Sequence, residues 1–249
     1  MGALTGKSAL ITGASGGIGF AIAQTFSREG AQVVITGRRE STLTEAVERL
    51  GSGALGVTGD VAEAAHHRRL AQEIAARFGR LDIYVANAGI NTVGETPEVS
   101  EADYDNQFAA NTRGIFFGVQ SIAPIMRDGG AILLTGSLAS EKVLEGHAVY
   151  AGTKAAIGAF ARSWAIELSG RGIRVNVLSP GPTDTGIVGK MGMPPEQVDE
   201  FAAGMAAAIP LGRFADPDEI ARAALFLASE ASSFVTGVNL RVDGGMALL

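Results

Sequence analysis

Tyr150 and Lys154 are the pair whose residue types and spacing most directly indicate proton transfer. Residues four positions apart on a helix lie on one face, which places a phenol beside an ammonium. A free tyrosine titrates at about 10, and a neighbouring ammonium favours the phenolate and moves its pKa toward operating pH. The pair could then act as a general acid or base near neutrality. The spacing alone is weak evidence, because Tyr and Lys also occur together on solvated surfaces.

Two further polar residues support a catalytic interpretation of this pair. Ser137 comes just after an apolar run at residues 131–135, at the carboxyl edge where open parallel sheets bind ligands. Asn111 lies inside a predicted helix, where asparagine is unusual unless its amide has a partner. We therefore expect Asn111, Ser137, Tyr150 and Lys154 to act together.

A glycine-rich turn, Thr12–Gly19, follows the first apolar run of the chain and opens into an amphipathic helix. Its Gly13, Gly17 and Gly19 form GxxxGxG, and no Lys-Ser/Thr follows, as a nucleoside triphosphatase would require. Glycines let the backbone approach a pyrophosphate closely, and the N–H groups at a helix start favour an anion. With a strand before it and a helix after it, we interpret the turn as a dinucleotide site rather than as structural glycines alone.

The elements that must position these residues alternate between short apolar runs and helical patterns along the chain. This rhythm predicts βαβ units and a doubly wound, Rossmann-type α/β fold, with a parallel sheet covered by helices on both faces. The seven expected strands are Ser8–Thr12, Gln32–Thr36, Ala54–Thr58, Ile83–Ala86, Ala131–Thr135, Arg174–Leu178 and Asn239–Val242.

Helical spacing and capping residues predict the main helices. One long helix is expected from a Ser100 cap to about Met126, and another from Tyr150 to Leu168. A last major helix should begin at Asp216–Pro217, where Asp caps and Pro occupies the first turn.

The domain organisation follows from the lack of any linker rich in Pro, Ser or charge, which predicts one domain over residues 1–249. The segment 182–210 is the exception. Several glycines and the pair Pro194–Pro195 interrupt any long helix there, and we interpret it as a mobile lid over the site.

Composition excludes several classes of function. With 47% hydrophobic and 18% charged residues, against about 25% charged in typical proteins, much of the surface should be buried in core or subunit contacts. The net charge of −6 supplies no basic field, so we expect no nucleic-acid partner. The absence of cysteine excludes disulfides and fits the cytoplasm, and no run is long enough to predict a membrane span. We expect His66 and His67 to lie on a solvated surface rather than at a metal site.

With these motifs, the sequence resembles the classical short-chain dehydrogenase/reductase family over essentially its whole length. Thr12–Gly19 is similar to the family's TGxxxGIG turn, and Asn87-Ala88-Gly89 to its NAG motif. The YxxxK of Tyr150 and Lys154, the turn Pro180-Gly181, and the catalytic positions Asn111 and Ser137 also match. Ala86 stands where the family often has a first Asn.

The resemblance implies an oxidoreductase that moves a hydride between a nicotinamide cofactor and a ketone or secondary alcohol. It implies that Tyr150 exchanges a proton with the substrate oxygen, which Ser137 hydrogen-bonds, and that Lys154 lowers the Tyr150 pKa and holds the nicotinamide ribose. Asn111 would fix a water that links Lys154 to solvent, and no metal is needed. The implied cofactor contacts are Gly13, Ser15, Gly17, Ile18, Gly19, Asp60, Val61, Asn87, Ala88, Gly89, Tyr150, Lys154, Pro180, Gly181, Thr183 and Thr185.

Arg38 and Arg39 favour NADP(H) over NAD(H). They follow the second strand, where NAD-using members of the family usually carry an Asp. A guanidinium suits a 2'-phosphate, which a carboxylate would repel. The competing interpretation is a solvated turn, and Glu40 is a rival ribose ligand that belongs better to the start of the next helix.

Two other functions share these motifs. One is a 3-oxoacyl thioester reductase, which would need a basic patch for an acidic acyl carrier protein. The other is a cofactor-sensing module without catalysis, against which the complete catalytic set argues. The segment Val235–Leu249 resembles the one by which family members pack as tetramers, so we expect a homotetramer, with a dimer as the alternative.

Overall fold

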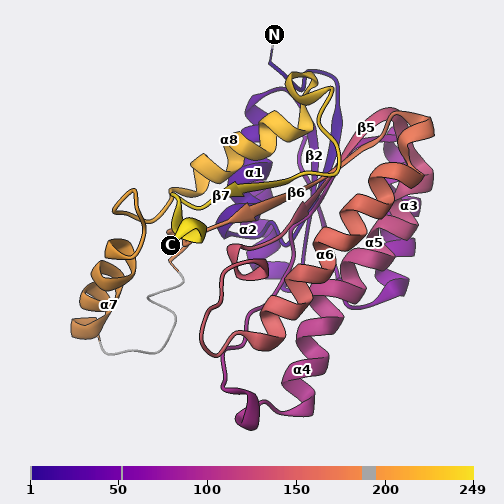
Figure 1. Cartoon of the computed structure of the whole chain (residues 1–249). Coiled ribbons are helices and arrows are strands. Elements are labelled where there is room, and N and C mark those ends of the chain that lie inside the picture. Colours follow the sequence, from indigo (N-terminus) through magenta and orange to yellow (C-terminus); the bar gives the residue numbers. More distant parts are fainter. Residues whose placement is uncertain (1, 52, 187–194) are drawn as a thin grey trace.

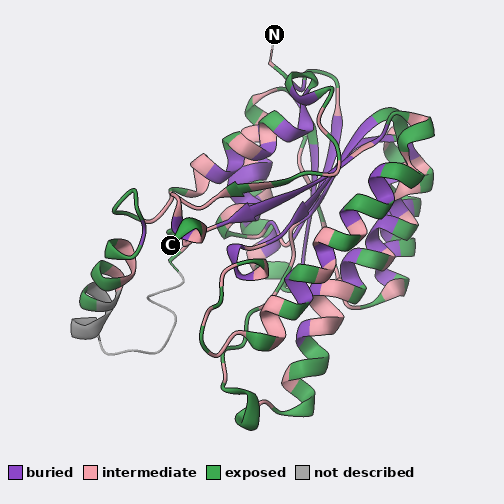
Figure 2. Ribbon diagram, in the orientation of Figure 1, coloured by how far each residue is buried: buried purple, intermediate pink, exposed green. Residues whose placement is uncertain are grey.

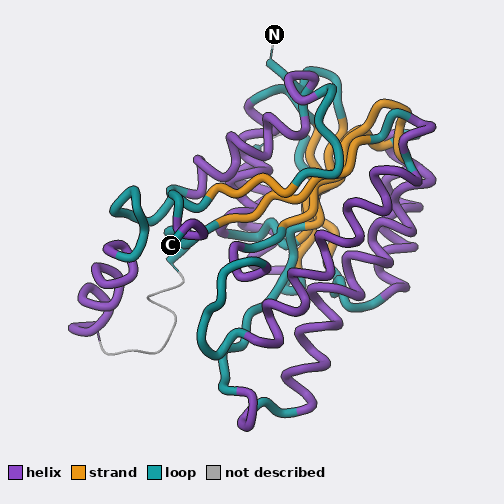
Figure 3. The backbone as a smooth tube through the Cα atoms, in the orientation of Figure 1, coloured by secondary structure: helices purple, strands orange, loops and turns teal. Residues whose placement is uncertain are grey.

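A parallel β-sheet forms the centre of the molecule (Figures 1 and 3). The computed structural model describes residues 2–51, 53–186 and 195–249. Within these residues the strands pair in the order β3-β2-β1-β4-β5-β6-β7, all parallel, so the predicted doubly wound fold is confirmed. The strands are β1 (Ser8–Thr12), β2 (Gln32–Gly37), β3 (Leu55–Thr58), β4 (Leu81–Ala86), β5 (Met126–Thr135), β6 (Arg174–Pro180) and β7 (Asn239–Val242).

Helices cover both faces of the sheet. The first face carries α1 (Gly17–Arg28), α2 (Glu40–Leu50) and α8 (Pro217–Ala228), and the second carries α3 (Ala64–Phe78), α5 (Gly114–Ile122) and α6 (Ala148–Glu167). Asp216 and Glu219 form the capping box of α8, which confirms the predicted helix start.

Strands β1, β2, β4, β5 and β6 each supply apolar side chains to two separate cores. Successive residues point to opposite faces, so Ile11 and Ile35 join the first core while Leu10 and Val34 join the second. The central strands are therefore buried along their whole length (Figure 2). Burial on both faces explains why they appear as continuous apolar runs in the sequence.

The single long helix predicted between Ser100 and Met126 is wrong in its middle and at its end. Ser100 caps α4 (Glu101–Phe108) as expected, but a π-helical turn at Ala109–Arg113 separates α4 from α5. A 3-10 turn at Ala123–Ile125, with Pro124 in it, then ends the helical stretch, and Met126 begins β5. Apolar spacing alone does not distinguish a π turn from a continuous α-helix.

Strand β5 begins earlier than predicted, at Met126 rather than Ala131. Its first half is polar and glycine-rich, so no apolar run marks it. The extension pairs with β4, where Leu81 lies opposite Met126, and the Arg127 guanidinium lies 3.1 Å from the Asp82 carboxylate. The other strand ends differ from the prediction by at most two residues, and β1 and β7 have the predicted bounds.

The expected lid at 182–210 contains a helix that the glycine and proline pattern did not predict. Helix α7 spans Pro195–Ala207 and includes Gly204. Pro195 stands at its first position, where its missing N–H costs no hydrogen bond. Residues 187–194 of this segment lie outside the described residues.

The expectation that His66 and His67 lie on a solvated surface is wrong, because both are buried at the start of α3. The loop that follows β3 covers the His66 ring, and α5 with β4 covers the His67 ring. Among the described helices, none is both long and apolar enough to cross a membrane.

Candidate active site

The glycine turn joins β1 to α1 and has room for an anion. Gly13 and Gly17 adopt φ values of +64° and +55°, the left-handed region that glycine enters most easily. A Cβ at Gly19 would lie 2.5 Å from the Asn87 amide nitrogen, so no side chain fits there. Gly16 caps α1 without a side-chain hydrogen bond, which leaves the N–H groups of the first turn free for a ligand.

The Asn87-Ala88-Gly89 loop after β4 is hydrogen-bonded directly to this turn. The Thr12 hydroxyl accepts from the backbone N–H groups of Asn87 and Ala88, both at 3.0 Å. The Asn87 amide donates to the carbonyls of Thr12 at 3.0 Å and Gly13 at 3.2 Å. The NAG and glycine motifs therefore form one rigid unit at the carboxyl edge of β1 and β4.

A cleft of about 220 Å³ runs along this edge. It brings together eight of the residues predicted to bind the cofactor: Gly13, Ser15, Arg38, Asp60, Val61, Asn87, Ala88 and Gly89. Sequence reasoning missed Thr36, Gly37, Gly59, Ile90 and Ala110, which also line it. Four of these adjoin strand ends or the NAG motif, and that position is the pattern that could have found them.

Other predicted cofactor contacts lie outside this cleft. Thr185 reaches the glycine turn, where its methyl group would lie 3.4 Å from a Cβ on Gly17. Arg39 is exposed beyond the end of β2, and Glu40 begins α2, as its sequence position indicated. The predicted contacts outside the cleft lining are Gly17, Ile18, Gly19, Arg39, Tyr150, Lys154, Pro180, Gly181, Thr183 and Thr185.

Tyr150 and Lys154, the predicted acid/base pair, lie at the same edge of the sheet. Tyr150 lies close enough to the Ser137 hydroxyl for that group to influence its pKa, and Ser137 caps the short turn after β5. The Lys154 Nζ donates to the Thr135 carbonyl at 2.8 Å and lies 5.6 Å from the centre of the Tyr150 ring. A Cβ on Gly89 would lie 3.5 Å from this Nζ, so the pair adjoins the cleft.

Asn111 lies in the π turn with its side chain fully buried. Its amide nitrogen donates to the Ile90 carbonyl at 2.8 Å and to the Thr153 hydroxyl at 3.1 Å. Its amide oxygen accepts from the Ile90 N–H at 2.8 Å. The side chain thus fastens the loop after β4 to α6, and any water link to Lys154 stays a prediction.

The protonation states of the pair differ from the sequence-based expectation. Burial raises the pKa of the Tyr150 phenol, and the hydrogen bond with Ser137 lowers it only in part. Burial also lowers the pKa of the Lys154 ammonium to about 8. Removing the phenolate from water outweighs attraction to an ammonium that is directed at the Thr135 carbonyl. Without a ligand, therefore, Lys154 does not bring the Tyr150 pKa toward neutrality.

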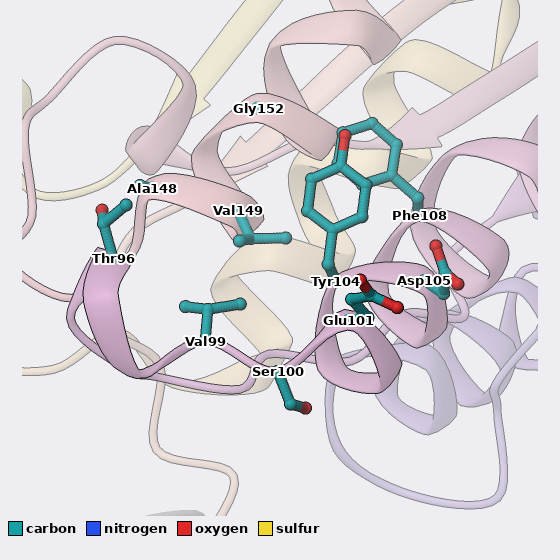
Figure 4. A pocket seen from close by; sticks show the side chains of 10 residues that line it. All are labelled: Thr96, Val99, Ser100, Glu101, Tyr104, Asp105, Phe108, Ala148, Val149 and Gly152. Atoms are coloured by element: carbon teal, nitrogen blue, oxygen red, sulfur yellow. The ribbon is translucent and has the colours of Figure 1, made fainter.

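Two larger hollows lie on the other side of α6. One, of about 640 Å³, is bordered by Tyr104 and Phe108 of α4 and by Val149 of α6 (Figure 4). The second, of about 590 Å³, lies along α4, α5 and α6. Neither is lined by Ser137, Tyr150 or Lys154, so size does not identify the reaction site here.

Within residues 2–51, 53–186 and 195–249, no three His, Asp or Glu side chains gather as a metal site would require. Beside the Ser137 hydroxyl lie the titratable groups of Tyr150 and Lys154. This set can hold a carbonyl oxygen and exchange a proton with it.

Comparison with known proteins gives consistent matches over nearly the whole chain. A family model described as "Enoyl-(Acyl carrier protein) reductase" matches residues 13–247. The oxidoreductase asL5 of Sarocladium schorii is 42% identical over 246 residues, which cover 98% of this chain and 97% of that protein. The hydroxynaphthalene reductase-like protein Arp2 of Metarhizium brunneum is 39% identical over 257 residues, with 97% and 95% covered.

Solved structures match equally well. A short-chain dehydrogenase/reductase from Serratia marcescens has a TM-score of 0.92 and 35% identity, covering 98% of this chain and 99% of that one. A blue fluorescent protein from a metagenomic library, solved in complex with NADPH, has a TM-score of 0.89 and 34% identity, with the same coverage.

Proposed function

This chain belongs to the classical short-chain dehydrogenase/reductase family, and from that premise we propose that it is an NADP(H)-dependent oxidoreductase acting on ketones and secondary alcohols. The observation that carries the proposal is that Tyr150, Ser137 and Lys154 lie together beside the cleft. Because the chain is a dehydrogenase/reductase with a complete catalytic set, a cofactor-sensing module without catalysis is disfavoured.

The residues around the cleft fit a dinucleotide. A Cβ at Gly13 would clash with Ala88 and one at Gly19 with Asn87, so glycine there lets the turn pack against the NAG loop, while the space beside Gly16 is open to a ligand. The uncapped start of α1 supports a pyrophosphate, and Asp60–Val61 supports an adenine contact at the far end. The nicotinamide, when bound, supplies the hydride.

The roles of Tyr150 and Ser137 follow from their protonation. Because burial keeps the Tyr150 phenol protonated, it can donate its proton to the carbonyl oxygen during reduction. The Ser137 hydroxyl lies near that phenol and can hydrogen-bond the same carbonyl oxygen. In the oxidative direction the phenolate form of Tyr150 would take the proton of the alcohol.

Lys154 and Asn111 support this proton transfer, the first by binding the cofactor and the second by fixing the loop beside it. The buried Lys154 Nζ has three N–H donors and one protein acceptor, Thr135, so it can also hold ribose hydroxyls. Asn111 fixes the Ile90 loop next to it, and a water beside the π turn would link Lys154 to solvent.

The preference for NADP(H) is supported by Arg38, which is exposed at the mouth of the cleft. Its guanidinium can donate two parallel hydrogen bonds to a 2'-phosphate. One structural relative was solved with NADPH, which is consistent with this choice.

The direct test is reduction of a panel of ketones with NADPH or NADH. The panel should include aliphatic, cyclic and bicyclic aromatic ketones, because the Arp2 relatives are named for hydroxynaphthalene reduction. We expect NADPH consumption with at least one ketone and recovery of the matching secondary alcohol. If no ketone reacts while a 3-oxoacyl thioester does, the proposal is wrong and the carrier-protein alternative holds.

That alternative is favoured by one observation, the description of the matching family model as an acyl carrier protein reductase. Against it stands the net charge of −6, because an acidic carrier protein needs a basic docking surface.

We also propose that the protein is a homotetramer. Several large apolar side chains lie exposed outside the cleft: Phe116, Ile166, Phe226, Phe234, Val238, Leu248 and Leu249. Leaving such groups in water is unfavourable, and twofold contacts would cover them. Light scattering at micromolar concentration should give four times the mass of one chain. A monomer would contradict the proposal, and half the expected mass would indicate the dimer.

The lid interpretation of 182–210 is retained as part of this proposal. The described ends of the segment support it, since Thr185 adjoins Gly17 and Ile209 packs with Leu138 next to Ser137.

A further inference from the structure

Two consecutive histidines, His66 and His67, are buried beneath the loop that follows β3. They are 3% and 1% exposed and stand in the first turn of α3. The loop above them supplies Gly59, Asp60 and Val61 to the cleft. The roles proposed for the catalytic residues leave both histidines unused.

His67 makes one specific contact with this loop. Its Nε2 lies 2.8 Å from the Val61 carbonyl oxygen. A carbonyl only accepts, so the hydrogen must reside on Nε2. Burial lowers the pKa of His67, which keeps the ring neutral and leaves Nδ1 with a lone pair. Within the described chain this Nδ1 has no hydrogen-bonding partner.

If the His67 imidazole only filled space here, it would be an energetically unfavourable choice. A buried acceptor without a partner is unfavourable, and phenylalanine would occupy a similar volume without that cost. What the histidine adds over an apolar ring is the N–H directed at Val61. The unpartnered Nδ1 therefore indicates that this donor is the useful part of the side chain.

The surroundings show what this donor holds in place. His67 lies among Thr12, Tyr84 and Ala88, so it supports the opposite wall of the cleft as well. Nearby, a Cβ on Gly59 would lie only 2.1 Å from the His66 ring, which fixes how the loop enters.

The loop's far end is held separately. The Arg113 guanidinium donates to the Ala62 carbonyl, and the Asp60 carboxylate accepts from the Ala62 N–H at 2.9 Å. Between Gly59, which packs on His66, and the hydrogen-bonded Ala62, the Val61 carbonyl depends on His67 for its orientation.

We propose that His67 is a positioning residue for the adenosine half of the cofactor. Its Nε2–H holds the Val61 carbonyl and so sets the backbone of Asp60 and Val61 against the adenine. The inference rests on the proposed function, in which that backbone contacts the adenine of a nicotinamide dinucleotide.

The test separates the two halves of the cofactor. His67→Phe should raise the Kd for NADPH, measured by fluorescence titration, by about three- to tenfold, the effect of losing one hydrogen bond. At saturating NADPH, kcat should stay within about twofold, and the KM for reduced nicotinamide mononucleotide, which lacks adenosine, should not change. His67→Gln, whose amide N–H can reach the same carbonyl, should restore most of the affinity.

The matched control is Ile115→Val, which alters packing in the same space without touching a hydrogen bond. It should leave the Kd for NADPH unchanged. Thermal melting checks that each variant folds. If His67→Phe does not fold, His67→Met provides the same comparison, because it also lacks the N–H donor. An unchanged Kd in the apolar variant, or an equal loss with the mononucleotide, overturns the inference. Failure of the wild-type protein to bind either dinucleotide would instead refute the proposed function.

Discussion

Tyr150→Phe is expected to lower kcat for ketone reduction by about 10²–10⁴-fold, the usual contribution of a general acid. The change removes one oxygen and leaves the ring that packs beside Lys154. Because the contacts that we propose for the glycine turn, the NAG loop and Lys154 do not depend on the Tyr150 hydroxyl, the Kd for NADPH should stay within about twofold. Steady-state rates and a fluorescence titration measure the two quantities.

Tyr104→Phe is the matched control for this variant. Tyr104 stacks on Phe108 with ring centres 4.6 Å apart, on the far side of α6. Loss of its hydroxyl should leave both kcat and Kd unchanged. If Tyr150→Phe keeps more than about a tenth of the wild-type rate, another group donates the proton.

The pH profile checks the protonation states on which this prediction depends. Lys154 carries its charge below about pH 8 and loses it above, whereas burial keeps Tyr150 protonated through that range. The kcat/KM for NADPH reports groups of the free enzyme. It should be level below about pH 8 and fall above it, because a neutral amine attracts an anionic cofactor less. Lys154→Met should lose this inflection, and a wild-type profile without one would contradict the assignment.

Arg38→Leu is expected to lower kcat/KM for NADPH by about 10- to 150-fold, the worth of one charge-assisted hydrogen bond of about 1.5–3 kcal/mol. Use of NADH should change by less than about twofold, because NADH has no 2'-phosphate. The wild-type enzyme should accordingly prefer NADPH by at least about tenfold. In a protein with net charge −6 the phosphate needs a local cation, and Arg38 is the arginine that lines the cleft.

Arg39→Leu is the matched control for cofactor choice, since Arg39 carries the same charge but does not line the cleft. Its effect on NADPH should be less than about threefold. Gly37→Asp is a poorer test, because its Cβ would lie 3.3 Å from the Ser15 hydroxyl and disturb the turn. Equal use of both cofactors by the wild type, or a preference untouched by Arg38→Leu, would mean that the arginines form only a solvated turn.

The parts of the fold that the sequence predicted well are those set by local patterns. The run Ser8–Thr12 is apolar because its strand is buried on both faces, and Asp216 caps a helix through its own neighbours. The polar half of β5 and the π turn at Asn111 are different, because each depends on a distant partner. No local sequence pattern predicts that Leu81 pairs with Met126.

The candidate site shows the same limit. Gly13 and Asn87 stand in motifs whose geometry needs those residue types, so they could be identified in advance. Gly59 follows a strand end, but its requirement for glycine could not be predicted, because that requirement comes from the His66 ring packed against it. The direction of the Tyr150 pKa was likewise missed, because burial, rather than the spacing to Lys154, decides it.

Because β1 lies between β2 and β4, the two walls of the cleft form at different stages as the chain is synthesised. One wall of the cleft comes from residues 13–61, and the other from residues 87–110 after the chain has crossed to β4. A nascent chain that has folded only its first three strands therefore has half of a binding site. The dinucleotide that we propose for this cleft needs β4 docked beside β1, and its binding would stabilise the folded state by mass action. Supply of the cofactor would thus act on the stability of the fold as well as on catalysis.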